Sequence, residues 1–207
     1  MRTPVKQIVS EATEKQGRKS QQKIILVLIA ALIIIAGMFI FWKKKNNTIH
    51  KKYEELIARL NFEKTLSEFP EEIKKENIKP ALNITDETLN KLLQKLEKFE
   101  NSDKYLKQEI SLTYMANNLG TNTKYLSEII KQHKGKSFNN YINGLRVDFI
   151  VKELYSNPKL REYKISHLAE ISGFASREVF AIVFKKETGI TPSYFINNLE
   201  KDKGNST

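Results

Sequence analysis

The chain has 207 residues, a formal net charge of +11 and no cysteine. Without cysteine it can form neither disulfides nor thiolate metal sites, and its length allows one or two small domains. The basic excess lies mainly near the start, because residues 1–60 carry 12 Lys and Arg against 4 Asp and Glu, whereas residues 105–207 carry 15 against 10. Composition alone is therefore weak evidence for nucleic-acid binding.

An apolar segment at residues 24–42 follows a polar N-terminal segment at residues 1–23. The nineteen residues of this segment carry no charge, and as a helix they would extend about 28 Å, close to the thickness of the hydrocarbon core of a bilayer. Trp42 and the lysines at 43–45 suit the membrane interface. We predict a single transmembrane helix. A signal peptide is disfavoured because no small-residue cleavage site follows, and a buried core helix is the remaining alternative.

Residues 43–84 are predicted to form a juxtamembrane stalk and linker. Ile49, Tyr53, Leu56 and Leu60 make a heptad-like stripe, which is too short to identify a coiled coil. A homodimer through residues 49–60 and a solvated helix lying partly on lipid are therefore both open. We expect residues 61–81 to be a linker with some local helix, because proline disfavours a helical conformation in the residue before it.

Residues 85–200 are predicted to form a helical domain, with a tail at residues 201–207. The first helix of this domain opens at Thr85, where a hydroxyl cap precedes acidic residues of the first turn. Its apolar stripe consists of Leu89, Leu92, Leu93, Leu96 and Phe99.

One pattern occurs twice between residues 110 and 196. The matched pairs are Ala116 with Ala169, Gly120 with Gly173, Leu126 with Phe180, Ile130 with Phe184, Lys131 with Lys185, and Gly135 with Gly189. The offset is 53 residues in the first two pairs and 54 in the others, so the second copy has one extra residue in its turn. Such a repeat in register indicates a duplicated structural unit.

Each copy is typical of two short helices joined by a glycine turn. Thr113 and Ser166 are the expected N-caps of the first helices, and Gly120 and Gly173 are expected to end those helices in a left-handed conformation. We predict helix-turn-helix units at 111–134 and 165–188, joined by a connector helix at 137–155. The second helix of such a unit can enter a DNA major groove. A pair of αα-hairpins that only builds a core is the alternative.

Residues 85–199 resemble the DNA-binding domain of AraC-type transcriptional regulators. The most specific part is the Gly173-Phe174 turn, the aromatics Phe180 and Phe184, the Lys185-Lys186 pair, and the Gly189-Ile-Thr191-Pro192 run. The resemblance implies that each unit lays its second helix in the major groove, on successive turns of one DNA face. The expected fold is all-α: one transmembrane helix, then a tandem helix-turn-helix domain with a long connector helix.

The candidate DNA-binding residues are those left outward when the apolar side chains of each second helix face inward. Leu126, Ile129 and Ile130 are expected inward in the first unit, and Phe180, Val183 and Phe184 in the second. The outward positions match those that the AraC family uses for DNA contacts. They are Thr123, Lys124, Ser127, Glu128 and Lys131 in the first unit, and Ser176, Arg177, Glu178, Ala181 and Lys185 in the second.

Three residues favour only modest DNA affinity. The family often has arginine where this chain has Ile182, and acids at Glu128 and Glu178 repel phosphate unless they accept from a cytosine amino group. We therefore expect binding to double-stranded DNA to depend partly on dimerisation or on tethering that raises the local concentration.

Catalytic chemistry has little support in the sequence. His50, His133 and His167 lack metal-ligand spacing, and neither a phosphate-binding glycine loop nor a nucleophile motif is present. We expect no enzymatic activity, no cofactor and no metal.

The leading hypothesis is therefore a membrane-anchored, sequence-specific transcriptional regulator of the bacterial cytoplasmic membrane. Its DNA-binding domain must lie in the cytoplasm, and the lysines after the apolar segment agree with that orientation. Only 23 residues precede the segment, so the chain is expected either to be a fragment, to take its signal from an external sensor or signalling partner, or to be merely localised by its anchor. The alternative is a membrane-bound interaction adaptor whose repeat no longer binds DNA.

Overall fold

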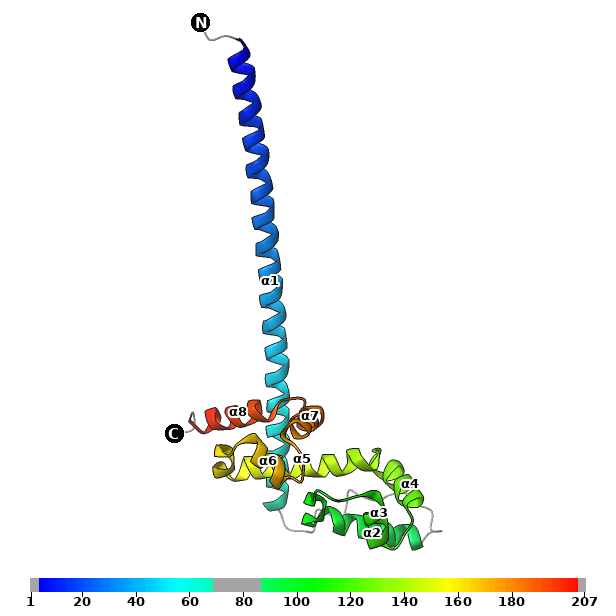
Figure 1. The fold of residues 1–207 in the computed structure, drawn as a ribbon. Coiled ribbons are helices and arrows are strands. Elements are labelled where there is room, and N and C mark those ends of the chain that lie inside the picture. Colours follow the sequence, from blue (N-terminus) through cyan, green and yellow to red (C-terminus); the bar gives the residue numbers. More distant parts are fainter. Residues whose placement is uncertain (1–3, 69–86, 205–207) are drawn as a thin grey trace. The chain divides into compact units, whose positions relative to one another are not determined.

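The computed structural model describes the backbone of residues 4–68 and 87–204, and the side chains of residue 28 and of residues 31–65 and 89–202 (Figure 1). Within these ranges every regular element is a helix, which confirms the predicted all-α class for the part of the chain described. The chain divides into two compact units, Met1–Lys51 and Lys52–Thr207.

The first unit consists of the N-terminal part of α1, a helix that runs from Pro4 to Glu68. The large apolar side chains that are described between Leu28 and Trp42 are 58% to 69% exposed. Among the residues that were described, no helix was found with both the length and the apolar character needed to cross a bilayer. The predicted span at residues 24–42 lies only partly within that search, because the side chains of residues 24–27, 29 and 30 are outside the described set.

The second unit contains the end of α1 and all the later helices. These are α2 (Glu87–Glu100), η2 (Asp103–Leu106), α3 (Leu112–Leu119), α4 (Thr123–Lys134), α5 (Phe138–Ser156), η3 (Pro158–Glu162), α6 (Ile165–Ile171), α7 (Arg177–Thr188) and α8 (Pro192–Gly204). α2 buries Leu92, Leu96 and Phe99, spaced by four and three residues, as the predicted stripe requires. The expected opening of α2 at Thr85 lies outside the described residues.

Two N-caps differ from the prediction. The expected cap at Thr113 is wrong, since Ser111 caps α3 and its hydroxyl accepts a hydrogen bond from the Tyr114 amide at 3.1 Å. The expected cap at Ser166 is also wrong, because α6 begins after Lys164, which makes no side-chain cap bond. Ser111 and Lys164 are 53 residues apart, so the two helices still begin at equivalent positions of the repeat.

The second unit has two apolar centres. One forms where α2, α3, α4 and the start of α5 meet, and it includes Leu96, Met115, Leu126 and Ile130. The other contains a row of aromatic rings from Phe174 through Phe180, Phe184 and Phe195 to Tyr53, whose successive centroids lie 5.4, 5.6, 5.9 and 6.0 Å apart. Such spacings are typical of favourable aromatic contacts.

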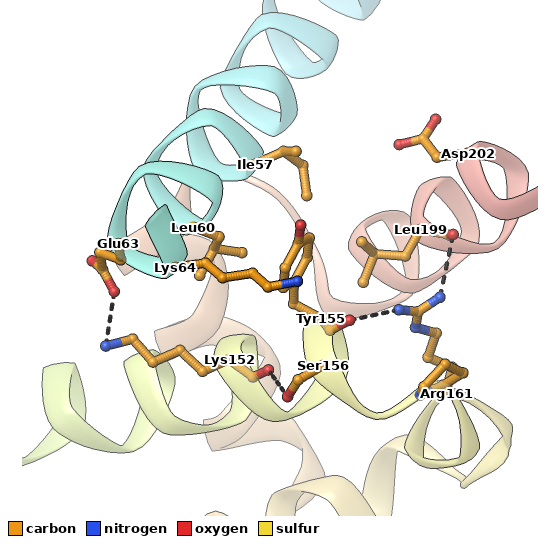
Figure 2. Close-up of a pocket in the computed structure, with 11 residues that line it drawn as sticks. Ile57, Leu60, Glu63, Lys64, Lys152, Tyr155, Ser156, Arg161, Leu199 and Asp202 are labelled. Atoms are coloured by element: carbon orange, nitrogen blue, oxygen red, sulfur yellow. Dashed lines mark hydrogen bonds and ion pairs between the residues drawn. The ribbon is translucent and has the colours of Figure 1, made fainter. Parts of the chain in front are cut away.

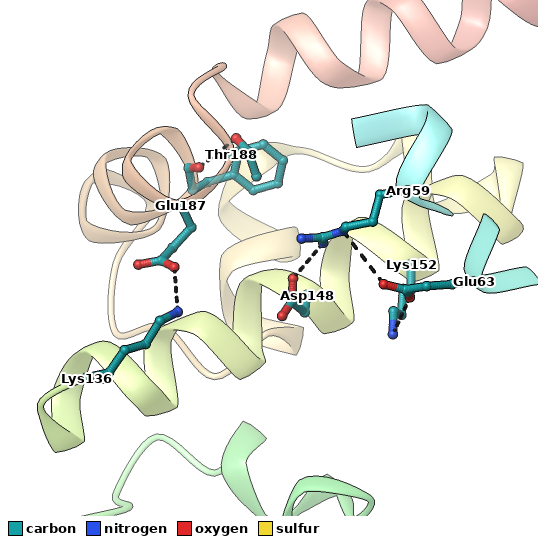
Figure 3. Close-up of polar contacts among 8 residues, drawn as sticks. Arg59, Glu63, Lys136, Asp148, Lys152, Glu187 and Thr188 are labelled. Atoms are coloured by element: carbon teal, nitrogen blue, oxygen red, sulfur yellow. Dashed lines mark hydrogen bonds and ion pairs between the residues drawn. The ribbon is translucent and has the colours of Figure 1, made fainter. Parts of the chain in front are cut away.

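Within the second unit, the last turns of α1 pack on the later helices through Tyr53, Leu56 and Leu60 of the predicted heptad-like stripe. Tyr53, Leu56 and Leu60 are buried, and the Tyr53 hydroxyl donates to the Asp202 carboxylate of α8. The Arg59 guanidinium lies 2.9 Å from the Asp148 carboxylate, and the Lys152 ammonium lies 2.9 Å from the Glu63 carboxylate (Figure 3). Tyr53, Leu56 and Leu60 are therefore covered by α5 and α8 of the same chain.

A groove of about 900 Å³ lies beside this contact (Figure 2). Its lining includes Leu60 of α1, Tyr155 of α5 and Leu199 of α8. Arg161 also lines it, but its guanidinium already donates to the carbonyls of Leu154, Tyr155 and Leu199 at 2.8, 2.9 and 3.3 Å. Arg161 therefore links the C-terminal end of α5 to α8 by hydrogen bonds.

Candidate nucleic-acid interface

Two helix pairs, α3 with α4 and α6 with α7, form the candidate interface. Gly120 and Gly173 lie in the turns of these pairs with φ of 70° and 79°, which confirms the predicted left-handed turns. Asn122 and Ser176 cap α4 and α7, since their side chains accept from the amides of Tyr125 and Val179 at 2.8 and 3.2 Å. The local sequence thus sets where each second helix begins.

Apolar side chains fix which face of α4 and α7 points outward. Leu126, Ile129 and Ile130 of α4 are buried, and so are Phe180 and Phe184 of α7. These inward positions were predicted, whereas Val183, also predicted inward, is only half-buried. The opposite face of each helix is consequently available to a ligand.

None of the ten predicted contact residues is buried. Ser127, Ser176 and Ala181 are half-buried, and the exposed ones are Thr123, Lys124, Glu128, Lys131, Arg177, Glu178 and Lys185. Ser176 is engaged as the cap of α7, so its hydroxyl has a structural role there. Five of these residues therefore lie on α4 and four on α7, which Ser176 precedes as its N-cap.

Arg146 of the connector helix α5 joins the turn of the second helix-turn-helix unit to the segment that precedes the first. This residue is 7% exposed. Its guanidinium donates from Nε to the Tyr105 carbonyl at 2.8 Å and from Nη2 to the Lys107 carbonyl at 2.7 Å, and it lies 5.6 Å from the centre of the Phe174 ring. Burial lowers the pKa of Arg146. Tyr105 and Lys107 lie in the segment before the first helix-turn-helix unit, and Phe174 lies in the turn of the second. Arg146 therefore joins that segment to that turn.

Gly173 adds a direct backbone contact between the same parts. A Cβ atom at this glycine would lie 2.2 Å from the Leu106 carbonyl oxygen, so the turn of the second unit approaches the segment before the first more closely than any side chain would allow. The Gln108 amide also donates to the Phe174 carbonyl at 3.2 Å.

Polar contacts also fix the end of α7 on the start of α5. The Lys136 ammonium lies 3.1 Å from the Glu187 carboxylate (Figure 3), and Lys186 donates to the Asn140 amide oxygen at 3.0 Å. Neither pair was expected, because the sequence gives no sign that residues about fifty positions apart meet. The orientation of α7 relative to the connector helix is thereby constrained.

The outward faces of the two second helices differ at their centres. In α4 the central residue is Glu128, whose carboxylate accepts from the Gln132 amide at 2.9 Å. In α7 the corresponding residue is Ile182, which is 69% exposed, and Val179 beside it is 47% exposed. Ile182 was expected only to be a departure from the family pattern, and Val179 was not predicted as a contact residue, although the two are spaced by three residues and so share a helix face.

Comparison with known proteins places this interface in a described domain family. The family model described as "Helix-turn-helix domain" matches residues 115–198, which include both helix pairs. The "Uncharacterized transcriptional regulatory protein YesN" of Bacillus subtilis (strain 168) is 35% identical over 88 residues. That match covers 42% of this chain and 23% of the relative, so the chain corresponds to about a quarter of the relative's length.

Solved structures give matches over about half of the chain. The C-terminal domain of AraT, a response regulator from Geobacillus stearothermophilus, is 24% identical, with a TM-score of 0.46 over 52% of this chain and 84% of that one. A Chromobacterium violaceum transcriptional regulator described as containing an AraC-type DNA-binding domain is 21% identical, with a TM-score of 0.44 over 53% and 92%. Residues 115–198 of this chain are thus similar to a helix-turn-helix domain.

Proposed function

We propose that this chain is a sequence-specific DNA-binding transcriptional regulator whose helices α4 and α7 read successive major-groove segments. The observation that carries the proposal is the presence of two helix-turn-helix units in one compact body, each with exposed basic side chains on its second helix. The name of the Bacillus subtilis relative supports a regulatory role.

The exposed side chains divide into two roles. Lys124, Lys131, Arg177 and Lys185 suit phosphate oxygens or guanine edges, because cationic side chains make most backbone contacts and also pair with guanine. Hydroxyls such as that of Thr123 suit either phosphates or base edges. The amides at the N-termini of α4 and α7 also favour a nearby phosphate.

The fixed relation of the two units supports simultaneous reading. Arg146 of the connector helix contacts Phe174 in the turn of the second helix-turn-helix unit, Gly173 of that turn approaches the Leu106 carbonyl, and the Lys136–Glu187 pair links α7 to the residues just before α5. A rigid pair binds both groove segments without first losing the entropy of orienting one unit against the other.

The test is fluorescence anisotropy of the purified full chain in detergent, with mixed-sequence duplex DNA over a series of salt concentrations. Phosphate binding predicts that log K falls linearly with log salt, with a slope of about −0.9 for each phosphate neutralised. Lys131→Ala and Arg177→Ala should each reduce that slope by about one unit.

The matched control is Lys98→Ala, which removes the same charge from α2, outside either second helix. It should leave the slope unchanged. If folded protein fails to bind duplex at low salt, or if all three variants change the slope equally, the proposal is wrong. Absence of binding would favour the membrane-bound adaptor.

We further propose that residues 24–42 anchor the chain in the bacterial cytoplasmic membrane, with the N-terminus outside and the C-terminal domain in the cytoplasm. Support comes from the uncharged run and from the ten large apolar side chains between Leu28 and Trp42 that are 58% to 69% exposed. A helix that is apolar on all sides is typical of burial in protein or lipid, and Trp42 followed by three lysines suits the interface.

Inverted membrane vesicles test this orientation. A protease added outside such vesicles should degrade the C-terminal domain and leave an N-terminal epitope protected. Protection of the C-terminal domain would contradict both the orientation and the regulator proposal. Release of the whole chain by alkaline carbonate would contradict the anchor alone.

A further inference from the structure

Ile182 stands at the centre of the outward face of α7. With about 100° between successive residues of a helix, Ile182 points roughly 160° away from both Phe180 and Phe184, the two side chains that α7 buries. Its side chain is 69% exposed. An isoleucine left this exposed gives the folded chain little of the stability that burial of a large apolar side chain provides.

The equivalent position of the first unit carries the opposite chemistry. Ile182 and Glu128 are 54 residues apart, the offset that relates the second helices of the repeat. Glu128 is an acceptor oriented by Gln132, whereas Ile182 with Val179 is an apolar surface. The two helices therefore present different chemical groups from the same place.

We propose that Ile182, with Val179 beside it, contacts the methyl group of a thymine in the major groove and so determines base preference for the second unit. This inference rests on the proposed DNA-binding function. Thymine is the base that displays an apolar group in the major groove, through its C5 methyl. The first unit, with Glu128 at the same place, has no such apolar contact and would not share the preference.

The surroundings of the patch favour a duplex over a protein partner. Lys185 and Lys186, three and four residues after Ile182, share its helix face and are exposed, as a surface that approaches phosphates requires. Glu178, four residues before Ile182, adds one carboxylate to the same face. Two side chains also form a small apolar patch, whereas a specific protein interface buries about 800 Å² on each partner. A single methyl group, by contrast, fits a patch of this size.

The test combines site selection with the removal of one methyl group. The full chain in detergent first selects its preferred sites from a library of duplexes with a randomised segment. Each thymine of the selected site is then replaced in turn by uracil, which lacks the C5 methyl but keeps the hydrogen-bonding edge. At one position the unmodified chain should bind about fourfold more weakly, the change expected when one buried methylene equivalent is lost.

Ile182→Ala should bind the thymine and uracil sites equally well, because the side chain that senses the methyl group is gone. Ile182→Gln should select sites without thymine at that position. The control is Phe62→Ala, which removes an exposed apolar side chain from α1 and should keep the fourfold difference. Circular dichroism checks that each variant is folded.

The outcomes separate the inference from the function on which it rests. Suppose that the chain selects a site, but that every uracil replacement changes the affinity of the unmodified chain and of Ile182→Ala by the same factor. The inference is then wrong, and DNA binding stands. If Ile182→Ala keeps both affinity and base preference, then the apolar patch faces a protein partner or solvent, which again overturns the inference. If no duplex is selected, the proposed function and the inference fail together.

Discussion

Gly173 is the residue on which two constraints meet. Its φ of 79° lies in the left-handed region, and a Cβ atom there would lie 2.2 Å from the Leu106 carbonyl oxygen. Another residue could adopt the left-handed conformation at moderate cost. The close approach to the Leu106 carbonyl, however, involves two backbone segments that cannot separate without disturbing the junction between the two helix-turn-helix units.

Gly173→Ala is therefore expected to lower the free energy of unfolding by about 3 kcal/mol or more, because left-handed strain and overpacking add. Urea unfolding followed by circular dichroism measures it. Gly120→Ala is the matched control: its φ is 70°, but its Cβ would meet only the Lys95 ammonium, at an ordinary 3.5 Å. That variant should lose about 1–2 kcal/mol. Equal losses in the two variants would show that the Leu106 contact contributes nothing.

The caps show how far a repeat in the sequence can be trusted at residue scale. Thr113 and Ser166 occupy matching places and carry hydroxyls, so both were predicted as N-caps. The helices instead begin two residues earlier in register, at Ser111 and Lys164. The repeat keeps the position at which the helices start but not the residue type at the cap. The prediction looked for a hydroxyl in both copies, whereas at the true cap position only the first copy has a hydroxyl, that of Ser111.

At the scale of elements, Tyr141 of α5 ties three helices together. It is 4% exposed, and its hydroxyl donates to the Glu100 carboxylate of α2 at 3.0 Å. The same carboxylate pairs with Lys134 of α4 at 2.7 Å. Burial, and then the neighbouring charge of Glu100, raise the pKa of Tyr141 above its ordinary range.

Stability should therefore fall at high pH. Tyrosine in the unfolded chain loses its proton near its ordinary pKa of about 10, while folded Tyr141 keeps its proton. Its contribution is thus complete below that value and is lost as the pH rises. Tyr141→Phe should cost about 1–2 kcal/mol at neutral pH and reduce the decline in urea midpoint between about pH 9 and about pH 11.

Part of the high-pH decline should survive in Tyr141→Phe. Burial also raises the pKa of Tyr53 and of Tyr105, and Tyr53 additionally donates to Asp202. A midpoint that falls just as steeply in the variant as in the unmodified chain would exclude Tyr141 as a contributor.

The helices could be predicted from the sequence more readily than the contacts between them. The stripe of α2 and the inward side chains of α4 follow from apolar spacing alone. Arg146 could not be found in this way, because in the sequence it looks like any exposed charge on an amphipathic helix. Its partners are carbonyls of Tyr105 and Lys107, and a carbonyl leaves no signature in residue type. The candidate contact residues were placed by the same apolar spacing, which is why Ile182, an apolar residue facing outward, did not fit.

At the scale of the whole molecule, the compact unit Lys52–Thr207 extends beyond the helix-turn-helix repeat. Residues 52–68 belong to this compact unit. The aromatic row that starts at Phe174, in the turn of the second helix-turn-helix unit, ends at Tyr53 of α1. The resemblance to a known family begins near residue 85, and the family match at residue 115, so neither marks the physical edge of the compact body.

This has a consequence for the preparation of a soluble fragment. A fragment cut at residue 85 would uncover Phe195 and Leu199, which are 0% and 5% exposed in the intact chain, and would leave Asp148 and Lys152 without their ion-pair partners. We expect it to bind a hydrophobic dye such as ANS and to precipitate on concentration, whereas a fragment that begins at Lys52 should stay monodisperse in size-exclusion chromatography. The useful boundary for expression thus lies about thirty residues before the point at which sequence similarity begins.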